Sequence, residues 1–144
     1  MLVQQILSSK ASDAVLTVKP GSLVRDAAQV LAENKIGSVV VSATGKAAAG
    51  ILSERDIVRE LANRGPGCLS EIVDDMMTSK LVTCTRGDTA DHVLEQMTNG
   101  RFRHMPVVED GELVGLITLG DVVKARLSEL AMEKNALEGM IMGH

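Results

Sequence analysis

Two hydroxyl–carboxylate pairs have the residue types and spacing needed to bind the phosphate and ribose of a nucleotide. Ser53 precedes Asp56 by three residues, and Thr118 precedes Asp121 by three. Each pair follows a short apolar run and opens a segment with helical periodicity. A hydroxyl at a helix N-terminus can donate to a phosphate oxygen, which the helix dipole also attracts. An ionised carboxylate one turn later can accept hydrogen bonds from ribose hydroxyls.

The same spacing also fits a simpler structural role, the helix capping box. There the N-cap hydroxyl accepts a hydrogen bond from the backbone three residues on, and the side chain at that position bonds back, with Glu or Gln the usual partner. Either pair taken alone is better explained as a cap. The two roles are compatible, because a cap can exchange its partners for those of a ligand.

The apolar pattern and the turn residues predict the elements that would position these pairs. In the first half, apolar residues recur at i, i+3, i+4 and i+7 from Val24 to Leu31, which predicts a helix, and Ile36 to Val41 is a β-branched, strand-like run. The expected elements are a short helix within 1–14, a strand at 15–18, a helix from an N-cap at Ser22 to Asn34, strands at 36–41 and 48–52, and a helix from Ser53 to residue 64.

The second half repeats this order after a bridging segment with helical spacing. Its expected elements are a strand at 81–84, a helix capped by Asp88, strands at 103–108 and 112–117 joined by a turn at 109–111, and a helix from Thr118 that continues as a helical tail to Gly139.

Alignment of the two halves shows an internal duplication. Thr17 aligns with Thr83 at an offset of 66, and Gly50 aligns with Gly115 at 65. The predicted fold is therefore α+β (α/β), with two tandem β-α-β-β-α repeats packed sheet to sheet about a pseudo-two-fold axis and a cleft between them. The expected ranges are 1–14 for a helix and linker, 15–64 for repeat 1, 65–80 for a bridge, 81–127 for repeat 2 and 128–144 for a helical tail.

The duplicated unit closely resembles a tandem pair of CBS (cystathionine β-synthase) domains, a Bateman module, over about residues 15–127. Each copy closes with Gly-aliphatic-aliphatic-Ser/Thr-x-x-Asp, and the segments 36–41 and 102–108 are further family features. The whole chain looks like the small stand-alone bacterial members. The resemblance implies a non-catalytic sensor that binds AMP, ADP, ATP, NAD or S-adenosylmethionine in the cleft, forms a homodimer and regulates an unknown partner protein.

The candidate nucleotide-binding residues combine the two pairs with nearby strand ends. Backbone groups around Thr17 and Thr83 would meet the adenine edge, and Arg103 and His104 would add positive charge for phosphate. The full set is Thr17, Val18, Ile36, Gly37, Ser38, Ser53, Arg55, Asp56, Thr83, Cys84, Arg103, His104, Pro106, Thr118, Gly120 and Asp121. We predict no catalytic residue and no metal ligand.

Composition disfavours several other classes. The net charge is −4 and aromatic residues make up 1% of the chain, so it lacks the basic field and stacking surface that favour nucleic-acid binding. Cys68 and Cys84 lack metal or redox spacing and are expected to be free thiols in a reducing cytoplasm. We predict no signal peptide and no membrane span. The sequence has no Walker loop or nucleophile elbow, which disfavours an enzyme.

Two hypotheses compete, a nucleotide sensor and a ligand-independent interaction module that dimerises through its C-terminal helix and keeps the two pairs only as caps. The copies also differ, because Arg103 and His104 stand where the first copy has Gly37 and Ser38. We expect the two sites to differ in affinity. We expect the Thr118–Asp121 half, with Arg103 and His104 nearby, to be the stronger.

Overall fold

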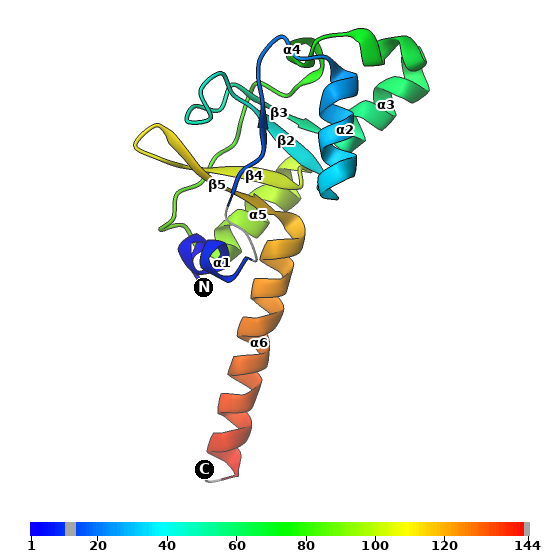
Figure 1. Ribbon diagram of the computed structural model, residues 1–144. Helices are drawn as coiled ribbons and strands as arrows, with labels where there is room; N and C mark the ends of the chain where they lie inside the picture. Colours follow the sequence, from blue (N-terminus) through cyan, green and yellow to red (C-terminus); the bar gives the residue numbers. More distant parts are fainter. Residues whose placement is uncertain (11–13, 143–144) are drawn as a thin grey trace.

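The computed structural model describes residues 1–10 and 14–142 and confirms the α+β fold of two tandem repeats (Figure 1). In chain order its elements are α1 (Val3–Ser9), β1 (Thr17–Val18), α2 (Val24–Asn34), β2 (Ser38–Val41), β3 (Gly50–Ser53), α3 (Glu54–Arg64), the 3-10 helix η1 (Pro66–Ser70), α4 (Val73–Met76), α5 (Ala90–Gly100), β4 (His104–Glu109), β5 (Glu112–Thr118) and α6 (Leu119–Ile141). The linker predicted after the first helix includes residues 11–13, which lie outside the described residues.

Each repeat contributes one small sheet. In the first, β2 pairs in parallel with β1 and antiparallel with β3, where Val40 lies opposite Ile51. In the second, β4 and β5 form an antiparallel pair with Pro106 opposite Leu116. The two antiparallel pairs end at the helices α3 and α6, so each hydroxyl–carboxylate pair lies at a strand-to-helix junction.

The strand predicted at 81–84 is wrong, because this segment is reduced to a single parallel bridge between Cys84 and Val107. That bridge takes the place of the β1–β2 pairing in the first repeat. Val82 and Thr83 are exposed, so Cys84 is the residue whose buried side chain anchors the segment against β4.

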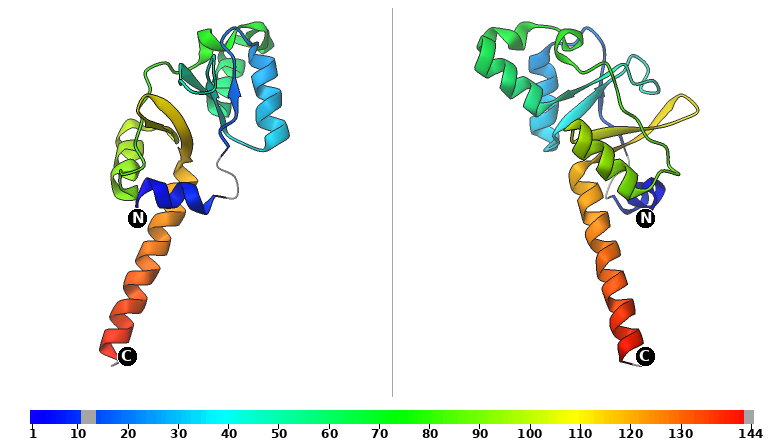
Figure 2. Two further views of the ribbon diagram at one scale, coloured as in Figure 1. Left: turned by 60° about the vertical axis from the view of Figure 1, so that its left-hand side comes forward. Right: turned by 180° about the vertical axis from the view of Figure 1, so that it is seen from behind.

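Alternate residues of the strands face two different environments, as the two-residue period of a strand requires. One set belongs to two separate hydrophobic cores, the first including Val39, Val41 and Leu52 and the second including Met105, Val107 and Ile117. The other set faces the opposite repeat. Val40 is fully buried but belongs to neither core, and Ile51 and Pro106 line one cavity although they come from different repeats. The repeats therefore meet through the second faces of their sheets (Figure 2).

The two short helices α1 and α4 form a further internal repeat, which was not predicted. Residues 2–10 read Leu-Val-Gln-Gln-Ile-Leu-Ser-Ser-Lys, and residues 72–80 read Ile-Val-Asp-Asp-Met-Met-Thr-Ser-Lys. Leu2 bridges to Thr89 just before α5, and Ile72 bridges to Leu23 just before α2. Helix α4 packs in the core of the first repeat, whereas α1 packs in the core of the second. The second repeat is therefore completed by the other end of the chain.

Two predicted helix caps are displaced by one residue. The N-cap of α2 is Leu23 rather than Ser22, and the N-cap of α5 is Thr89 rather than Asp88. The carboxylate of Asp88 instead accepts a hydrogen bond from the Thr85 backbone N–H at 2.7 Å. It is therefore used in the turn before the helix rather than at the helix start.

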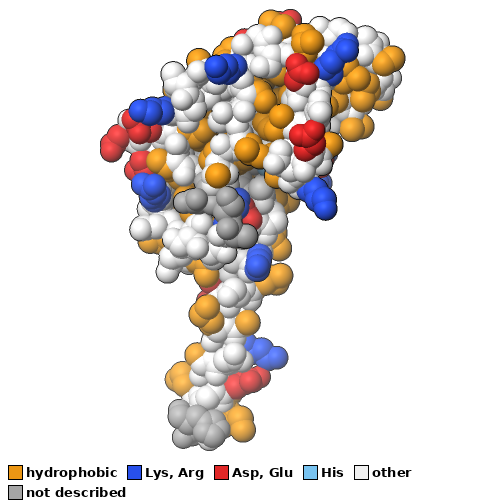
Figure 3. Space-filling view, in the orientation of Figure 1, with side chains coloured by type: hydrophobic (Ala, Val, Ile, Leu, Met, Phe, Trp, Pro, Cys, Tyr) orange, Lys and Arg blue, Asp and Glu red, His pale blue; other side chains and the backbone are white. Residues whose placement is uncertain are grey.

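Helix α6 leaves the body of the molecule and projects away from both repeats (Figures 1 and 2). It continues through Gly139, which was predicted to interrupt the tail, and the Met142 backbone N–H still donates to the Glu138 carbonyl at 2.9 Å. Hydrophobic side chains lie along the projecting part (Figure 3). Within the residues that the structure describes, no helix is both long and apolar enough to cross a membrane.

Candidate functional site

Two cavities open between the repeats, one beside each hydroxyl–carboxylate pair. The first, which we call the Ser53 cavity, has a volume of about 620 Å³ and lies between the β3–α3 junction and residues 100–106 of the second repeat. It is lined by Ile51, Ser53, Arg55, Asp56, Arg59, Thr78, Lys80, Leu81, Val82, Gly100, Arg101, Phe102, Arg103, His104 and Pro106.

The second, which we call the Thr118 cavity, has a volume of about 540 Å³ and lies between the β5–α6 junction and residues 34–38 of the first repeat. It is lined by Leu7, Lys10, Ala14, Val15, Leu16, Asn34, Lys35, Ile36, Gly37, Ser38, His104, Leu116 and Thr118. Each cavity thus takes its helix terminus from one repeat and its opposite wall from the other. Both volumes fall in the range of small-molecule sites.

At the Ser53 cavity the hydroxyl and carboxylate form a capping box. The Ser53 hydroxyl accepts from the Asp56 backbone N–H at 3.2 Å, and Asp56 Oδ2 accepts from the Ser53 backbone N–H at 3.0 Å and from the Ser53 hydroxyl at 2.9 Å. The spacing therefore produces the structural cap that it predicts. A ligand that uses these groups must replace these short internal hydrogen bonds.

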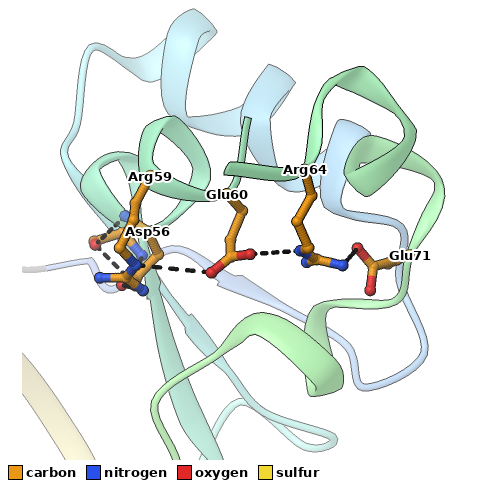
Figure 4. A network of polar contacts seen from close by, with 6 residues as sticks. Asp56, Arg59, Glu60, Arg64 and Glu71 are labelled. Atoms are coloured by element: carbon orange, nitrogen blue, oxygen red, sulfur yellow. Dashed lines mark hydrogen bonds and ion pairs between the residues drawn. The ribbon is translucent and has the colours of Figure 1, made fainter. Parts of the chain in front are cut away.

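A row of charged side chains continues from Asp56 along α3 (Figure 4). Arg59 lies 3.1 Å from Asp56 Oδ1, and Glu60 contacts both Arg59 and Arg64, at 3.7 and 2.6 Å. Arg64 then reaches Glu71 in the segment before α4, at 2.7 Å. Exposed ion pairs of this kind contribute little stability, but this row holds Arg59 at the mouth of the Ser53 cavity.

The Thr118 pair is also a capping box, but its carboxylate has an additional partner from α1. Asp121 Oδ2 accepts from the Thr118 backbone N–H at 3.0 Å and from Lys10 Nζ at 2.9 Å, and Lys10 also donates to the Leu116 carbonyl. Burial raises the pKa of Asp121, but the hydrogen bonds from Thr118 and Lys10 outweigh it and lower the pKa below its ordinary value. Asp121 is therefore ionised and ion-paired at neutral pH.

His104 lines both cavities and is the side chain that they share. Its ring lies against Gly37, where a Cβ atom would be 3.1 Å from His104 Nε2. Burial lowers the pKa of His104; the negative charges of Glu54, Asp121 and Asp56 oppose this effect, and Arg103 adds to it. The imidazole is therefore neutral near pH 7, with one nitrogen able to donate and the other able to accept.

Ser38 supplies an unsatisfied polar atom in the wall of the Thr118 cavity. The residue is 3% exposed, and its hydroxyl has no hydrogen-bond partner among the described residues. Buried hydroxyls without partners are uncommon in native proteins. The Ser38 hydroxyl would gain a partner if a polar group of a ligand reached it through this wall.

The two cavities collect most of the residues predicted from the sequence. Ser53, Arg55, Asp56, Arg103, His104 and Pro106 line the first, and Ile36, Gly37, Ser38, His104 and Thr118 line the second. Asp121 is held beside the second through Lys10 and Thr118. Arg103 lies beside the β5–α6 junction through its backbone, where its carbonyl accepts from the Leu119 N–H at 2.8 Å, but the residue lines the Ser53 cavity and not the Thr118 cavity. The reason is that each cavity takes its helix terminus from one repeat and its opposite wall from the other.

Besides Asp121, five predicted residues line neither cavity: Thr17, Val18, Thr83, Cys84 and Gly120. Val18 packs against the first core, and Cys84 lies within the second. Burial, followed by the nearby charges of Asp88 and Glu109, raises the pKa of the Cys84 thiol to about 12. Cys68 and Cys84 are both free thiols.

Several residues of the cavity walls were not predicted from the sequence, above all the equivalent lysines Lys10 and Lys80. The repeat between α1 and α4 ends at these two positions, so alignment of residues 2–10 with 72–80 would have placed them. Arg101 was missed because it ends α5 in a left-handed conformation that no motif marks. Within the described part of the chain, no group of three or more His, Cys, Asp or Glu side chains is placed to hold a metal ion.

Two β-α-β-β-α repeats that face each other across paired cavities define the class as a duplicated α+β module. The family model for the CBS domain matches residues 3–63 and 73–128. The chain therefore belongs to the CBS domain family and carries two tandem copies of the domain, which confirms the resemblance seen in the sequence. Both matched segments begin at the short helices α1 and α4.

Known proteins of similar sequence and structure agree with this assignment. The mitochondrial CBS domain-containing protein CBSX3 of Arabidopsis thaliana is 32% identical over 98% of this chain and 72% of its own length. The crystal structure of the CBS-domain containing protein ATU1752 from Agrobacterium tumefaciens has a TM-score of 0.82 and 44% identity, covering 88% of this chain and 99% of that one. The CBS domain protein PAE2072 from Pyrobaculum aerophilum, solved in complex with AMP, has a TM-score of 0.78 and 28% identity, covering 92% and 99%.

Proposed function

We propose that the protein is a non-catalytic regulatory module that binds an adenosine-containing ligand, such as AMP, ADP, ATP, NAD or S-adenosylmethionine, between its repeats. The observation that carries this proposal is the repetition of the site: at two equivalent cavities, a helix begins with a hydroxyl and a carboxylate. The AMP complex of the Pyrobaculum aerophilum relative supports this class of ligand.

The chemistry of the cavity walls gives each part of such a ligand a partner. Phosphate would lie at the N-terminus of α3 or α6, where the Ser53 or Thr118 hydroxyl donates to it. Asp56 or Asp121 would accept from the ribose hydroxyls. The adenine would pack between apolar groups of both repeats, for example Ile51 and Pro106 in the Ser53 cavity. Binding then exchanges the bonds of a capping box for bonds to the ligand.

Regulation follows from the position of the ligand between the two repeats. A molecule that contacts both walls stabilises the arrangement in which the walls fit it, and it shifts the population toward that arrangement. A partner protein that prefers one arrangement would then respond to ligand concentration. A cytoplasmic location stays a prediction from the sequence.

Calorimetry and thermal-shift titration with AMP, ATP, NAD and S-adenosylmethionine test the proposal. We expect at least one ligand to bind, and the double variant Asp56→Asn/Asp121→Asn to weaken that binding by about 10-fold or more, because each carboxylate makes charge-assisted hydrogen bonds. The matched control is Asp26→Asn/Asp75→Asn, which removes two exposed carboxylates outside both cavities. Absence of binding by all four ligands, or equal weakening in the control, would refute the proposal.

The second candidate is an interaction module that works without ligand, with α6 as its binding surface. Both carboxylates already have internal partners. On the projecting helix, apolar residues recur with the 4-3 spacing of a coiled-coil seam and are exposed: Val123, Leu127, Leu130, Leu137 and Ile141. We propose that a second copy of the chain covers this seam. The homodimer is compatible with either candidate, and a partner captured equally well with and without nucleotide would favour the second.

A further inference from the structure

The basic side chains of this acidic protein are concentrated at one of the two cavities. The chain has 15 Lys and Arg residues and a net charge of −4. Five of those basic residues line the Ser53 cavity, namely Arg55, Arg59, Lys80, Arg101 and Arg103, and Asp56 is the one acidic residue in that lining. Arg59 is paired with Asp56. The side chains of the other four make no ion pair or hydrogen bond within the described residues.

The Thr118 cavity has a very different balance. Lys10 and Lys35 are the basic residues in its lining, and Lys10 is neutralised by Asp121 at 2.9 Å. Most of the remaining wall is apolar: Leu7, Ala14, Val15, Leu16, Ile36 and Leu116. The unpartnered hydroxyl of Ser38 adds a neutral polar group. Among the residues that the structure describes, one unpaired cation therefore faces this cavity, against four at the other.

Two pairs of equivalent positions account for most of this difference, and the rest comes from Lys10, which is paired with Asp121 whereas the equivalent Lys80 has no ion pair within the described residues. Arg103 in the Ser53 cavity corresponds to Gly37 in the Thr118 cavity, and Arg55 corresponds to Gly120. A side chain at position 37 would press on the His104 ring, because its Cβ would lie 3.1 Å from Nε2. The His104 ring thus occupies space that an arginine at position 37, the equivalent of Arg103, would need. The packing of His104 against Gly37 keeps the Thr118 cavity weakly charged.

We propose that the two cavities divide ligands by phosphate charge: the Ser53 cavity selects adenosine di- or triphosphates, and the Thr118 cavity selects adenosine ligands with one phosphate or none. This inference rests on the proposed function and adds the ligand class of each cavity. A guanidinium group can bind two phosphate oxygens at once through two N–H donors. Unpaired cations gathered at one cavity also attract a polyanion, and no internal ion pair has to break for them to do so. A polyphosphate in the Thr118 cavity would meet a single free amine and an apolar wall.

Calorimetric titration with ATP and with AMP tests this division. In an Asp121→Ala/Lys10→Ala background, which removes the ribose acceptor of the Thr118 cavity together with the cation that it neutralises, we expect ATP to bind at least about 10-fold more tightly than AMP. In an Asp56→Ala/Arg59→Ala background, which does the same at the Ser53 cavity, we expect that preference to disappear or reverse. Adding Arg55→Ala/Arg103→Ala to the first background should lower the affinity for ATP by about 10-fold or more and change the affinity for AMP much less.

The matched control is Arg25→Ala/Arg86→Ala, which removes the same charge from two exposed arginines outside both cavities. Circular dichroism and thermal melts show that each variant is folded before titration. Retention of the ATP preference in Arg55→Ala/Arg103→Ala, or its equal loss in the control, would overturn the division. Equal affinities of ATP and AMP in both backgrounds would overturn it while leaving the proposed function intact, whereas no binding of any adenosine ligand by the unaltered protein would remove both.

Discussion

At the scale of single residues, the two carboxylates show how one motif acquires different properties from its surroundings. Asp56 and Asp121 occupy equivalent positions in two capping boxes. Asp56 pairs with Arg59, which is exposed and follows on the same helix, whereas Asp121 pairs with the half-buried Lys10 from α1. A ligand at the Thr118 cavity must compete with an ammonium group held from another element.

His104 gives a pH-dependent prediction at this scale. Burial lowers its pKa in the folded protein, against the charges of Glu54, Asp121 and Asp56. The unfolded chain, with a His pKa of about 6.5, therefore binds more protons, and stability is lost as the pH falls below about 6.5. We expect His104→Gln to reduce the loss of unfolding free energy between about pH 7.5 and 5.5, measured by urea denaturation. His92→Gln, at an exposed position on α5, is the control, and a change as large in that variant would contradict the assignment.

The sequence predicted the residues of each hydroxyl–carboxylate pair better than it predicted the residues that surround the pairs. Ser53, Asp56, Thr118 and Asp121 lie at helix starts because a local rule, the capping box, governs them. The cavity walls instead combine residues far apart in the chain, such as Lys10 beside Asp121. No local pattern encodes which repeat faces which, so the sequence did not predict which cavity Arg103 lines.

At the scale of elements, the short helices α1 and α4 fix the position of glycines that begin the two repeated motifs. Gly115 lies under Leu7 of α1, where a Cβ would be 2.7 Å from Leu7 Cδ2, and Gly50 lies in the same way under Met77 after α4. The repeated glycine is therefore a packing requirement. Both glycines could be recognised in the sequence as parts of the repeated motif. The reason for glycine at these positions, close packing against Leu7 and Met77, depends on where the short helices lie.

We predict that Gly115→Ala destabilises the protein by about 1–3 kcal/mol, because an added methyl overpacks the contact with Leu7. Gly67→Ala is the control, since a Cβ there has no neighbour within 4 Å and φ is not positive. Urea denaturation measures both, and a double-mutant cycle with Leu7→Ala should recover part of the loss. Equal costs at the two glycines would contradict the contact with Leu7 as the cause.

The apolar seam on α6 predicts a dimer and also the relative orientation of its two α6 helices. Lys134 falls on the seam between Leu130 and Leu137. A parallel pair would place Lys134 against its own copy, whereas an antiparallel pair places it opposite Leu130 and places Lys124 near Glu138. We expect Leu127→Glu/Leu137→Glu to give monomers in light scattering, with Ser128→Glu/Asn135→Glu, at two exposed positions of α6 off the seam, as the control.

Cysteine cross-linking separates the two directions. The pair Val123→Cys/Ile141→Cys should form intermolecular disulfides if the helices are antiparallel. Either single variant should cross-link if they are parallel. A monomeric unaltered protein would contradict the seam as a dimer surface.

At the scale of the whole molecule, the duplication and the α+β class were predictable because both depend on repeated local patterns. The absence of a regular strand at 81–84 was not predictable, because the apolar residues of this segment do not reveal that Val82 stays exposed. The sequence predicted a single cleft between the repeats, whereas the structure has a pseudo-symmetric pair of cavities. Two cavities result because the repeats touch at the centre, where His104 meets Gly37.

The packing of α1 on the second repeat has a consequence for the order in which the chain folds during synthesis. Residues 15–80 contain every element of the first repeat, including α4, so this part can close as soon as it is made. The second repeat must wait for its own residues and then bind α1, whose Val3, Ile6 and Leu7 fill its core. Each such side chain contributes about 1.5–3 kcal/mol on burial.

A fragment of residues 81–142 should therefore melt at a lower temperature than a fragment of residues 15–80. A synthetic peptide of residues 1–10 added in trans should raise the melting temperature of the first fragment and leave the second unchanged. An Ile6→Ala peptide should lose this effect and a Gln4→Ala peptide should keep it, because Ile6 is buried and Gln4 is exposed. Helix α1 would then find its place last, although it is synthesised before either repeat.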